Sequence, residues 1–239
     1  MRVTAIVQAR MASSRFPGKV LADLAGRPLL VHAIARAMST PGVDGLVVAT
    51  TTAPVDDVVA ALCARIGVTV FRGSEPDVLD RFYRATRRHA ADAVMRVTAD
   101  CPLLDPLVSG LVVARFREGD VDYASNVHPR TFPDGLDTEV FAVAALERAW
   151  REARLPAQRE HVTPYLWSHP EMFRCANVAY DRDLSAHRWT VDEPRDLELL
   201  RGLFRRLSEG GAPLFGMTEV LALLEREPHL AAPPAAGRP

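Results

Sequence analysis

The residues best suited to chemistry lie in the first loop of the chain, residues 8–19. This loop follows a short apolar run and carries three cations, Arg10, Arg15 and Lys19, with small residues between them. Lys19 is the only lysine among the 29 basic residues. A lysine ammonium is a compact charge that suits phosphate oxygens, whereas arginine favours planar contacts with two oxygens. The loop is therefore either a triphosphate cradle or a solvated surface loop.

Two aspartates, Asp100 and Asp192, each follow a predicted strand, where a carboxylate can face a bound phosphate. Carboxylates repel phosphates, so a divalent cation between them would offset the repulsion. The same cation would neutralise negative charge on a leaving group. The alternatives are a turn aspartate for Asp100 and a helix cap for Asp192. We interpret Asp105, which precedes Pro106, as a helix cap, and Asp196 as part of a solvated helix face.

A later loop, residues 128–137, has more hydrogen-bond acceptors than a plain turn needs. It holds Arg130, Asp134 and Asp137, and Glu139 follows two residues after it. Carboxylates accept hydrogen bonds from hydroxyl groups, so these residues could recognise a polyol. A simple turn at Asp134 and the glycine that follows is an equally good interpretation. His161 is either a substrate contact or, as we favour, a helix residue packed in a polar pocket.

Alternating strands and helices position the first of these groups. Apolar runs at residues 4–9, 45–50, 68–71 and 93–97 predict strands, and each is followed by a helical pattern. Four such units predict a parallel sheet with helices on both faces. Ligands of such sheets bind beyond the carboxyl ends of the strands. The loops at that edge begin near Arg10, Thr50, Arg72 and Asp100.

The second half of the chain alternates less regularly. Its predicted strands are residues 122–126, 138–141, 173–179 and 188–191. Its predicted helices are one around Leu146 and Trp150 and others at 159–167, 197–207 and 220–224. Together these patterns predict one α/β domain with a mixed, mainly parallel sheet. The Ala- and Pro-rich tail, 229–239, is predicted to be disordered.

The composition excludes several classes of protein. A net charge of −1 gives no general attraction to nucleic acid, so anion binding must come from a local cluster. Three widely spaced cysteines form neither a disulfide framework nor a zinc pattern, which favours a cytoplasmic location. No signal peptide and no apolar run of membrane-spanning length is recognisable. The P-loop, the dinucleotide glycine motif and the nucleophile elbow are also missing.

Linked motifs along nearly the whole chain resemble the cytidylyltransferases that make CMP-activated sugars. The acylneuraminate and 3-deoxy-manno-octulosonate enzymes are the best-known members, and the resemblance is closest to the spore-coat polysaccharide biosynthesis F branch. The matching segments are residues 8–21, 70–75, 77–83, 96–103, 133–141, 159–164 and 189–192.

The resemblance implies a Rossmann-like domain of the nucleotide-diphospho-sugar transferase type over residues 1–228. Residues 1–120 would bind the nucleotide, and 121–228 would bind the acceptor and form a homodimer through residues 132–167. In the first loop, the implied triphosphate-binding residues are Ala9, Arg10, Arg15, Gly18 and Lys19. The residues implied to surround ribose and base are Thr50, Thr51, Arg72, Gly73 and Ser74. Asp100 and Asp192 would hold Mg²⁺.

The implied reaction is attack by an acceptor oxygen on the α-phosphorus of CTP, with release of pyrophosphate. Arg10, Lys19 and Asp100 would be the catalytic residues, acting by positioning and charge neutralisation. The acceptor would be an acidic, sugar-like molecule used in polysaccharide, glycoconjugate or natural-product biosynthesis. Its expected contacts are Arg130, Asp134, Asp137, Glu139 and His161. The sugar-site patterns of the octulosonate and neuraminate branches are missing, so neither sugar is named.

Two other functions remain open on the sequence. A glycosyltransferase of the same sheet architecture would use a ready-made nucleotide sugar, and such enzymes often present Asp-x-Asp for a metal. Here Asp100 is followed by Cys101 and Pro102, so the second aspartate is missing. The other alternative is a non-catalytic nucleotide-binding protein that retains the fold.

Overall fold

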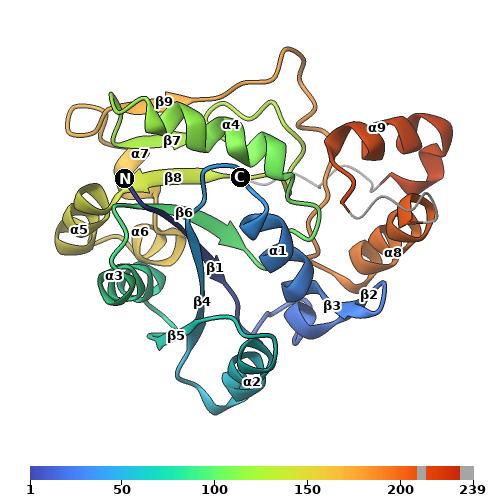
Figure 1. Cartoon of the computed structure of the whole chain (residues 1–239), viewed down its shortest axis with the longest axis horizontal. Coiled ribbons are helices and arrows are strands. Elements are labelled where there is room, and N and C mark those ends of the chain that lie inside the picture. Colours follow the sequence, from blue (N-terminus) through green and yellow to red (C-terminus); the bar gives the residue numbers. More distant parts are fainter. Residues whose placement is uncertain (209–213, 232–239) are drawn as a thin grey trace.

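A seven-stranded sheet forms the centre of the molecule, whose computed structural model describes residues 1–208 and 214–231 (Figure 1). The strand order is β5-β4-β1-β6-β8-β7-β9. The first four of these strands are parallel, β8 runs antiparallel to both β6 and β7, and β9 is parallel to β7. The predicted mixed, mainly parallel sheet is therefore confirmed. The strands are β1 (Val3–Gln8), β4 (Gly45–Thr51), β5 (Val70–Gly73), β6 (Ala93–Thr98), β7 (Tyr123–Ser125), β8 (Glu139–Ala142) and β9 (Cys175–Asn177).

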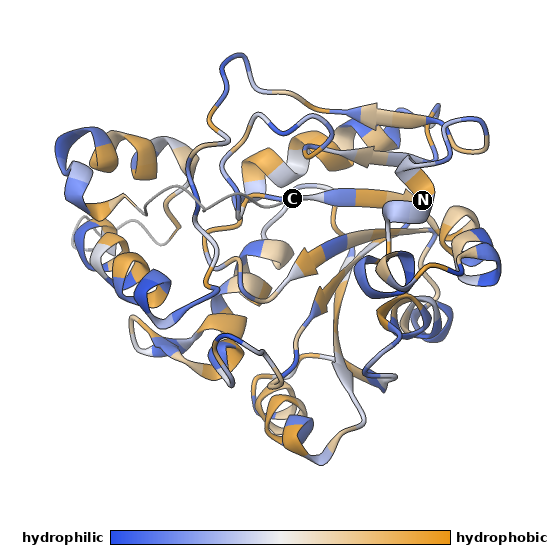
Figure 2. Ribbon diagram, turned by 180° about the vertical axis from the view of Figure 1, so that it is seen from behind, coloured by the Kyte–Doolittle hydropathy of each residue, from blue (hydrophilic) through white to orange (hydrophobic). Residues whose placement is uncertain are grey.

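Helices cover both faces of the sheet, as predicted. Side chains alternate along β1, so Val3, Ala5 and Val7 face one layer and Ile6 faces the other. The first layer contains α1 (Leu29–Met38), α2 (Asp57–Arg65) and α4 (Pro106–Arg117). The second contains α3 (Val78–His89), α5 (Val143–Glu152) and α7 (Pro164–Trp167), with α6 (Pro156–His161) against α3. Figure 2 shows mostly hydrophobic strands, with hydrophilic stretches in outer helix turns and loops.

The C-terminal helices form a separate apolar cluster beside the sheet, which we call the end lobe. It consists of α8 (Pro194–Ser208), α9 (Met217–Arg226) and the hairpin of β2 (Asp23–Leu24) and β3 (Arg27–Pro28). Asp105 connects the end lobe to α4. Its carboxylate accepts hydrogen bonds from the backbone N–H of Leu107, at 2.8 Å, and of Met217, at 2.6 Å. The predicted cap is thus confirmed, and it also holds α9.

The structure differs from the predictions at several places. Residues 188–191 form no strand and make only a single bridge, between Arg188 and Asp134, because the helix α8 begins directly afterwards. The helix expected at 159–167 is two helices, since Pro164 cannot continue the first. The hairpin of β2 and β3 was not predicted, and neither was the 3₁₀ helix η1 (Lys19–Leu21).

The predicted disorder of the tail is wrong at its start. His229 and Leu230 belong to the 3₁₀ helix η3 (Pro228–Leu230), where Leu230 packs against the end lobe. From residue 232 onwards, that prediction falls outside the described ranges. Cys63 and Cys101 are buried free thiols, and Cys175 is an exposed one. Within the described ranges, no helix is long and apolar enough to cross a membrane.

Candidate active site

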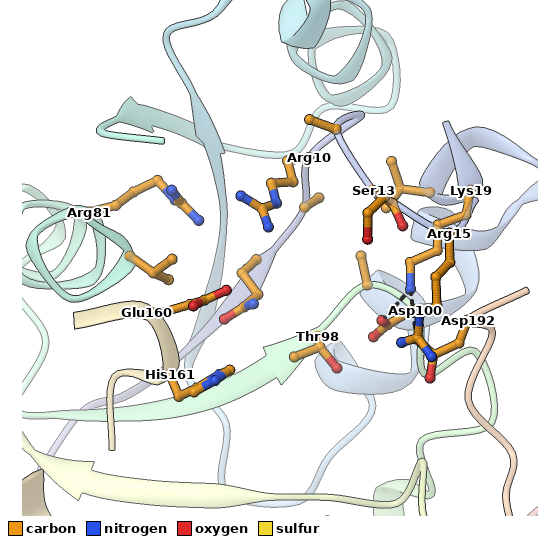
Figure 3. Close-up of a pocket in the computed structure, with 17 residues that line it drawn as sticks. Arg10, Ser13, Arg15, Lys19, Arg81, Thr98, Asp100, Glu160, His161 and Asp192 are labelled. Carbon is orange, nitrogen blue, oxygen red and sulfur yellow. Dashed lines mark hydrogen bonds and ion pairs between the residues drawn. The ribbon is translucent and has the colours of Figure 1, made fainter. Parts of the chain in front are cut away.

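A cleft lies at the carboxyl ends of β1 and β6, where the strand order predicted a ligand site (Figure 3). Its lining comes from the loop after β1, the end of β6, the start of α3, the end of α6 and the turn before α8. These segments are far apart in sequence, and the sheet brings them together. The residues that line it include Gln8, Ala9, Arg10, Ser13, Arg15, Lys19, Val78, Arg81, Thr98, Asp100, Glu160, His161 and Asp192.

Lys19 is buried at one side of the cleft and binds three oxygen atoms. Its ammonium Nζ donates to Oδ2 of Asp100 at 2.7 Å, to the carbonyl oxygen of Val191 at 2.7 Å and to Oδ1 of Asp192 at 3.3 Å. The two aspartates proposed as metal ligands therefore meet at one cation. We call this group, together with Arg15, the carboxylate end of the cleft.

Gly18 sets the position of Lys19. Its φ of +76° lies in the left-handed region, which glycine enters without steric cost, and its N–H donates to the Met11 carbonyl at 2.9 Å. A Cβ at this position would lie 3.3 Å from Cε of Met11. The turn lets the chain enter η1 with Lys19 as its first residue. Gly18 thus supports the site through its backbone.

The charge of Lys19 controls the ionisation of Asp100. Burial opposes the charged form of this carboxyl, but the Lys19 ammonium and its hydrogen bond outweigh burial, so the pKa of Asp100 is lowered. On the other side, Nη2 of Arg15 lies 2.9 Å from Oδ1 of Asp192. Asp100 is therefore held in its charged form by Lys19, and Asp192 is contacted by both Lys19 and Arg15.

Asp196 does not lie on a solvated helix face, so that prediction is wrong. It is buried and accepts hydrogen bonds from the backbone N–H groups of Asp192 and Glu193, each at 2.8 Å. The guanidinium of Arg188 donates to both of its oxygens, at 2.9 and 2.5 Å. Asp196 therefore fixes the turn that presents Asp192 to the cleft. The prediction for Asp196 failed because an aspartate in the first turn of a helix is usually exposed to solvent.

The oxygen atoms around Lys19 Nζ also fit a magnesium ion. Mg²⁺ prefers hard oxygen ligands and usually takes one or two carboxylates, with water and phosphate completing its shell. Asp100 and Asp192 supply two carboxylates that approach a common point, and the Val191 carbonyl supplies a third oxygen. Among the described residues, no cluster of three or more His, Cys, Asp or Glu side chains could hold a metal.

The opposite side of the cleft is built around arginine. Figure 3 shows Arg10 and Arg81 extending towards one another, with Glu160 and His161 on the neighbouring segment. We call the part formed by Gln8, Arg10, Val78 and Arg81 the arginine end. Burial, and then the positive charge of Arg10, lower the pKa of Arg81 to about 10.

Arg81 did not emerge as a site residue from the sequence, although it lies within a motif of the resemblance. It is 1% exposed and lies three residues after Val78 and four before Ala85, on the buried face of α3. An arginine on an otherwise apolar helix face is a signal that could have identified it, because arginine is rarely fully buried without a partner or ligand.

A strained turn presents Glu160 and His161 to the cleft. Val162 has φ 72° and ψ −55°, and the N–H of Thr163 donates to the carbonyl of His161 at 2.8 Å, which defines a γ-turn. Such a conformation typically costs about 1–3 kcal/mol in a β-branched residue. Burial of the Val162 side chain maintains it. His161 is thereby placed in the cleft lining, not in the polar pocket that we favoured.

The residues expected around ribose and base lie outside the lining of this cleft. Thr50 and Thr51 are buried in β4, and Thr51 donates to the carboxylate of Asp56. Arg72 donates to the carbonyls of Thr51, at 2.8 Å, and Ala53, at 3.0 Å, so it supports the end of the sheet. Their role in nucleotide binding, and that of Gly73 and Ser74, stays a prediction.

The expected acceptor loop also lies outside this lining, and its charges are paired internally. Arg130 binds both oxygens of Asp137, one of them at 2.7 Å, and lies 3.7 Å from Asp134. Glu139 is buried and accepts from Arg96 at 2.5 Å and from the Tyr123 hydroxyl at 2.7 Å. A role of Arg130, Asp134, Asp137 and Glu139 in acceptor binding remains a prediction.

Comparison with known proteins identifies the family. A family model described as cytidylyltransferase matches residues 4–208. The chain is 35% identical to the spore coat polysaccharide biosynthesis protein SpsF of Bacillus subtilis over 235 residues, 95% of each protein. It is 38% identical over 130 residues to a 3-deoxy-manno-octulosonate cytidylyltransferase from an Anaeromyxobacter species, covering 54% of this chain and 52% of that enzyme.

A solved structure agrees with the sequence comparison. The structure of a cytidylyltransferase from Leptospira borgpetersenii matches this chain with a TM-score of 0.90 at 31% identity, over 96% of each chain. The similarity therefore includes the sheet, both helix layers and the end lobe. As the resemblance of its motifs predicted, this chain belongs to the cytidylyltransferase family and is a nucleotidyltransferase.

Proposed function

We propose that this enzyme transfers CMP from CTP to an acidic, sugar-like acceptor and releases pyrophosphate. The observation that carries the proposal is the carboxylate end of the cleft, where Lys19 joins Asp100 and Asp192 beyond the strand ends. Cations that can bind phosphate stand there beside carboxylates that can bind a metal. The family and the octulosonate enzyme among the relatives support CTP and an acidic sugar.

In the proposed reaction an acceptor hydroxyl oxygen forms a bond to the α-phosphorus of CTP. The bond between that phosphorus and the oxygen bridging to the β-phosphate breaks, and pyrophosphate leaves with the electron pair. The hydroxyl proton passes to solvent or to a nearby base. Arg10, Arg15 and Lys19 bind phosphate oxygens and hold the α-phosphorus in line with the acceptor.

Asp100 and Asp192 would hold Mg²⁺, which neutralises charge on the phosphates when it is bound. Lys19 now occupies the point at which the two carboxylates meet. Binding of a nucleotide would offer the Lys19 ammonium a new anionic partner, and Asp100 and Asp192 would be the residues that hold the metal. The same three side chains would thus bind one another in the free enzyme, whereas in the complex Lys19 would bind phosphate and the two aspartates would hold the metal.

An assay of pyrophosphate release tests the proposal. The enzyme is incubated with Mg²⁺, each of the four nucleoside triphosphates and a panel of acidic sugars. Pyrophosphate formed only with CTP, together with a CMP conjugate, is the expected result. Release of UDP from a UDP-sugar would identify a glycosyltransferase instead, and nucleotide binding without any turnover would identify a non-catalytic protein.

A further inference from the structure

The backbone on either side of Arg10 sets its place in the cleft. The Arg10 side chain lines the cleft without a hydrogen bond or ion pair to any described residue. Before it, the N–H of Ala9 donates to the carbonyl oxygen of Ala49 at 3.2 Å. After it, the N–H of Met11 donates to Oδ1 of Asp56 at 2.7 Å. Both neighbours of Arg10 are therefore fixed, while its guanidinium is left for a ligand.

The backbone of Met11 also connects Asp56 with Lys19. The Met11 carbonyl oxygen accepts the N–H of Gly18 at 2.9 Å. Gly18 directly precedes Lys19, the first residue of η1. A displacement of Met11 would therefore move Arg10 and Lys19 together.

Asp56 does not act as an ordinary helix cap. It lies at the N-cap position of α2, where an aspartate usually accepts hydrogen bonds from the first turn, but its side chain makes no such bond. The carboxylate is buried, with the residue 1% exposed, and it accepts from the Met11 N–H and the Thr51 hydroxyl. A buried carboxylate is costly unless hydrogen-bonded, so these contacts are needed. Asp56 thus replaces a local contact with one to a residue 45 positions away.

The negative charge of Asp56 also lies close to the cations of the cleft. Burial and the positive charge of Arg10 lower the pKa of Arg81, and Asp56 is the carboxylate that opposes this shift most. Arg10 and Arg81 line the cleft, whereas Asp56 lies outside that lining. Asp56 therefore stands behind the first loop and supports its cations without reaching a ligand.

We propose that Asp56 is a positioning residue that shapes the first loop for a triphosphate. Through the Met11 N–H it holds Arg10, and through the bond between Met11 and Gly18 it holds Lys19, so that both cations meet the same phosphate chain. A loop that is ordered before the ligand arrives has less conformational freedom to lose on binding. This role rests on the proposed use of a nucleoside triphosphate and adds the residue that organises its binding loop.

Titration calorimetry of the full chain with Mg²⁺ and inorganic tripolyphosphate tests this role. Asp56→Ala should bind at least about tenfold more weakly than wild type, because a hydrogen bond to a charged group is typically worth roughly 10- to 150-fold. Asp56→Asn can still accept the Met11 N–H. It should bind at least about threefold more tightly than Asp56→Ala, because a neutral hydrogen bond has roughly half the strength of a charge-assisted one.

Asp57→Ala is the matched control. Asp57 is the next residue and also a carboxylate, but its side chain is 64% exposed and pairs with Arg72 at 2.7 Å. Its replacement should leave tripolyphosphate affinity unchanged.

Nuclear magnetic resonance gives a second measurement that does not need the alanine variant to fold. Protein labelled with ¹⁵N at methionine shows the Met11 amide directly, and Met11→Leu assigns its signal. Asp56→Asn should move the Met11 amide proton upfield, because a neutral acceptor makes a weaker hydrogen bond than a carboxylate. The signals of Met38 and Met95 should stay in place.

Unchanged tripolyphosphate affinity in folded Asp56→Ala overturns this role, and so does an equal loss of affinity in Asp57→Ala. An unchanged Met11 signal in Asp56→Asn overturns it as well. CMP transfer from CTP could continue in each case, so the proposed function would survive. Conversely, tripolyphosphate binding that depends on Asp56 in an enzyme without CMP transfer would leave the role standing and refute the function.

Discussion

Replacing Lys19 with methionine separates two tasks of one side chain. Methionine retains most of the apolar stem and removes the ammonium that Asp100, Asp192 and the Val191 carbonyl share. In the proposed reaction that ammonium binds the triphosphate, and in the free enzyme it occupies the place suited to a metal. The variant should therefore lose turnover and gain affinity for a divalent ion.

The size of each effect follows from the burial of the three side chains. Those of Lys19 and Asp192 are 11% and 9% exposed, and that of Asp100 is 25% exposed. Removing one partner of a buried ion pair typically destabilises by about 3–5 kcal/mol. Because Asp100 is partly solvated and Asp192 keeps Arg15, we expect about 3 kcal/mol. Loss of one preorganised contact to the reacting phosphate should lower turnover by roughly 10²- to 10³-fold.

Affinity for metal should change in the opposite direction. A positive charge about 4 Å from an incoming dication opposes it by up to about 8 kcal/mol near a protein surface, twice the value for two unit charges. Mn²⁺ binding without nucleotide, measured by electron paramagnetic resonance, should therefore be at least roughly tenfold tighter in Lys19→Met than in wild type. Arg15→Met is the control, because Arg15 is exposed and contacts one carboxylate oxygen; its effect should be smaller.

The reasoning is refuted if Lys19→Met binds Mn²⁺ no more tightly than wild type while its turnover stays near normal. Unchanged metal affinity would mean that Lys19 does not compete for the site. Normal turnover would mean that the ammonium does not hold phosphate. Thermal unfolding of each variant shows whether the fold is kept.

Three further predictions concern the catalytic aspartate, acid stability and assembly. Asp100→Asn should reduce CMP transfer strongly and leave the melting temperature within a few degrees of wild type; near-normal pyrophosphate release would contradict its role. Stability should fall as the pH drops below about 4, because the folded pKa values of Asp100 and Asp196 are lowered and their stabilisation is lost as each becomes protonated. In Asp196→Asn, part of this pH dependence should disappear from denaturant titrations at pH 7 and pH 3. We propose a homodimer through residues 132–167, where Trp167 is exposed; Trp167→Glu should give a monomer in sedimentation, and an unchanged species would exclude this surface.

Strand periodicity predicted where the cleft lies but not how its side chains pair. The runs at β1 and β6 are mainly apolar, so their carboxyl ends could be placed from the sequence, and Lys19 and Asp100 with them. Asp192 lines the cleft although the strand expected before it does not form. Asp196 could not be placed, because its burial depends on Arg188, a partner held by a turn without a periodic pattern. The position of His161 likewise depends on an unusual backbone conformation at the next residue.

The strained turn at Val162 explains why the second half of the chain reaches the cleft at all. In a regular helix through residues 159–167, successive side chains would point in different directions around the helix axis. The γ-turn instead reverses the chain directly after His161, so Glu160 and His161 stay at the rim while Val162 enters the apolar core. Thr163 follows the turn, and after Arg96 it helps to lower the pKa of the buried Glu139, which Arg96 and Tyr123 hold inside the sheet. The γ-turn thus places His161 in the cleft lining within two residues of Thr163, whose side chain influences the charged group inside the sheet.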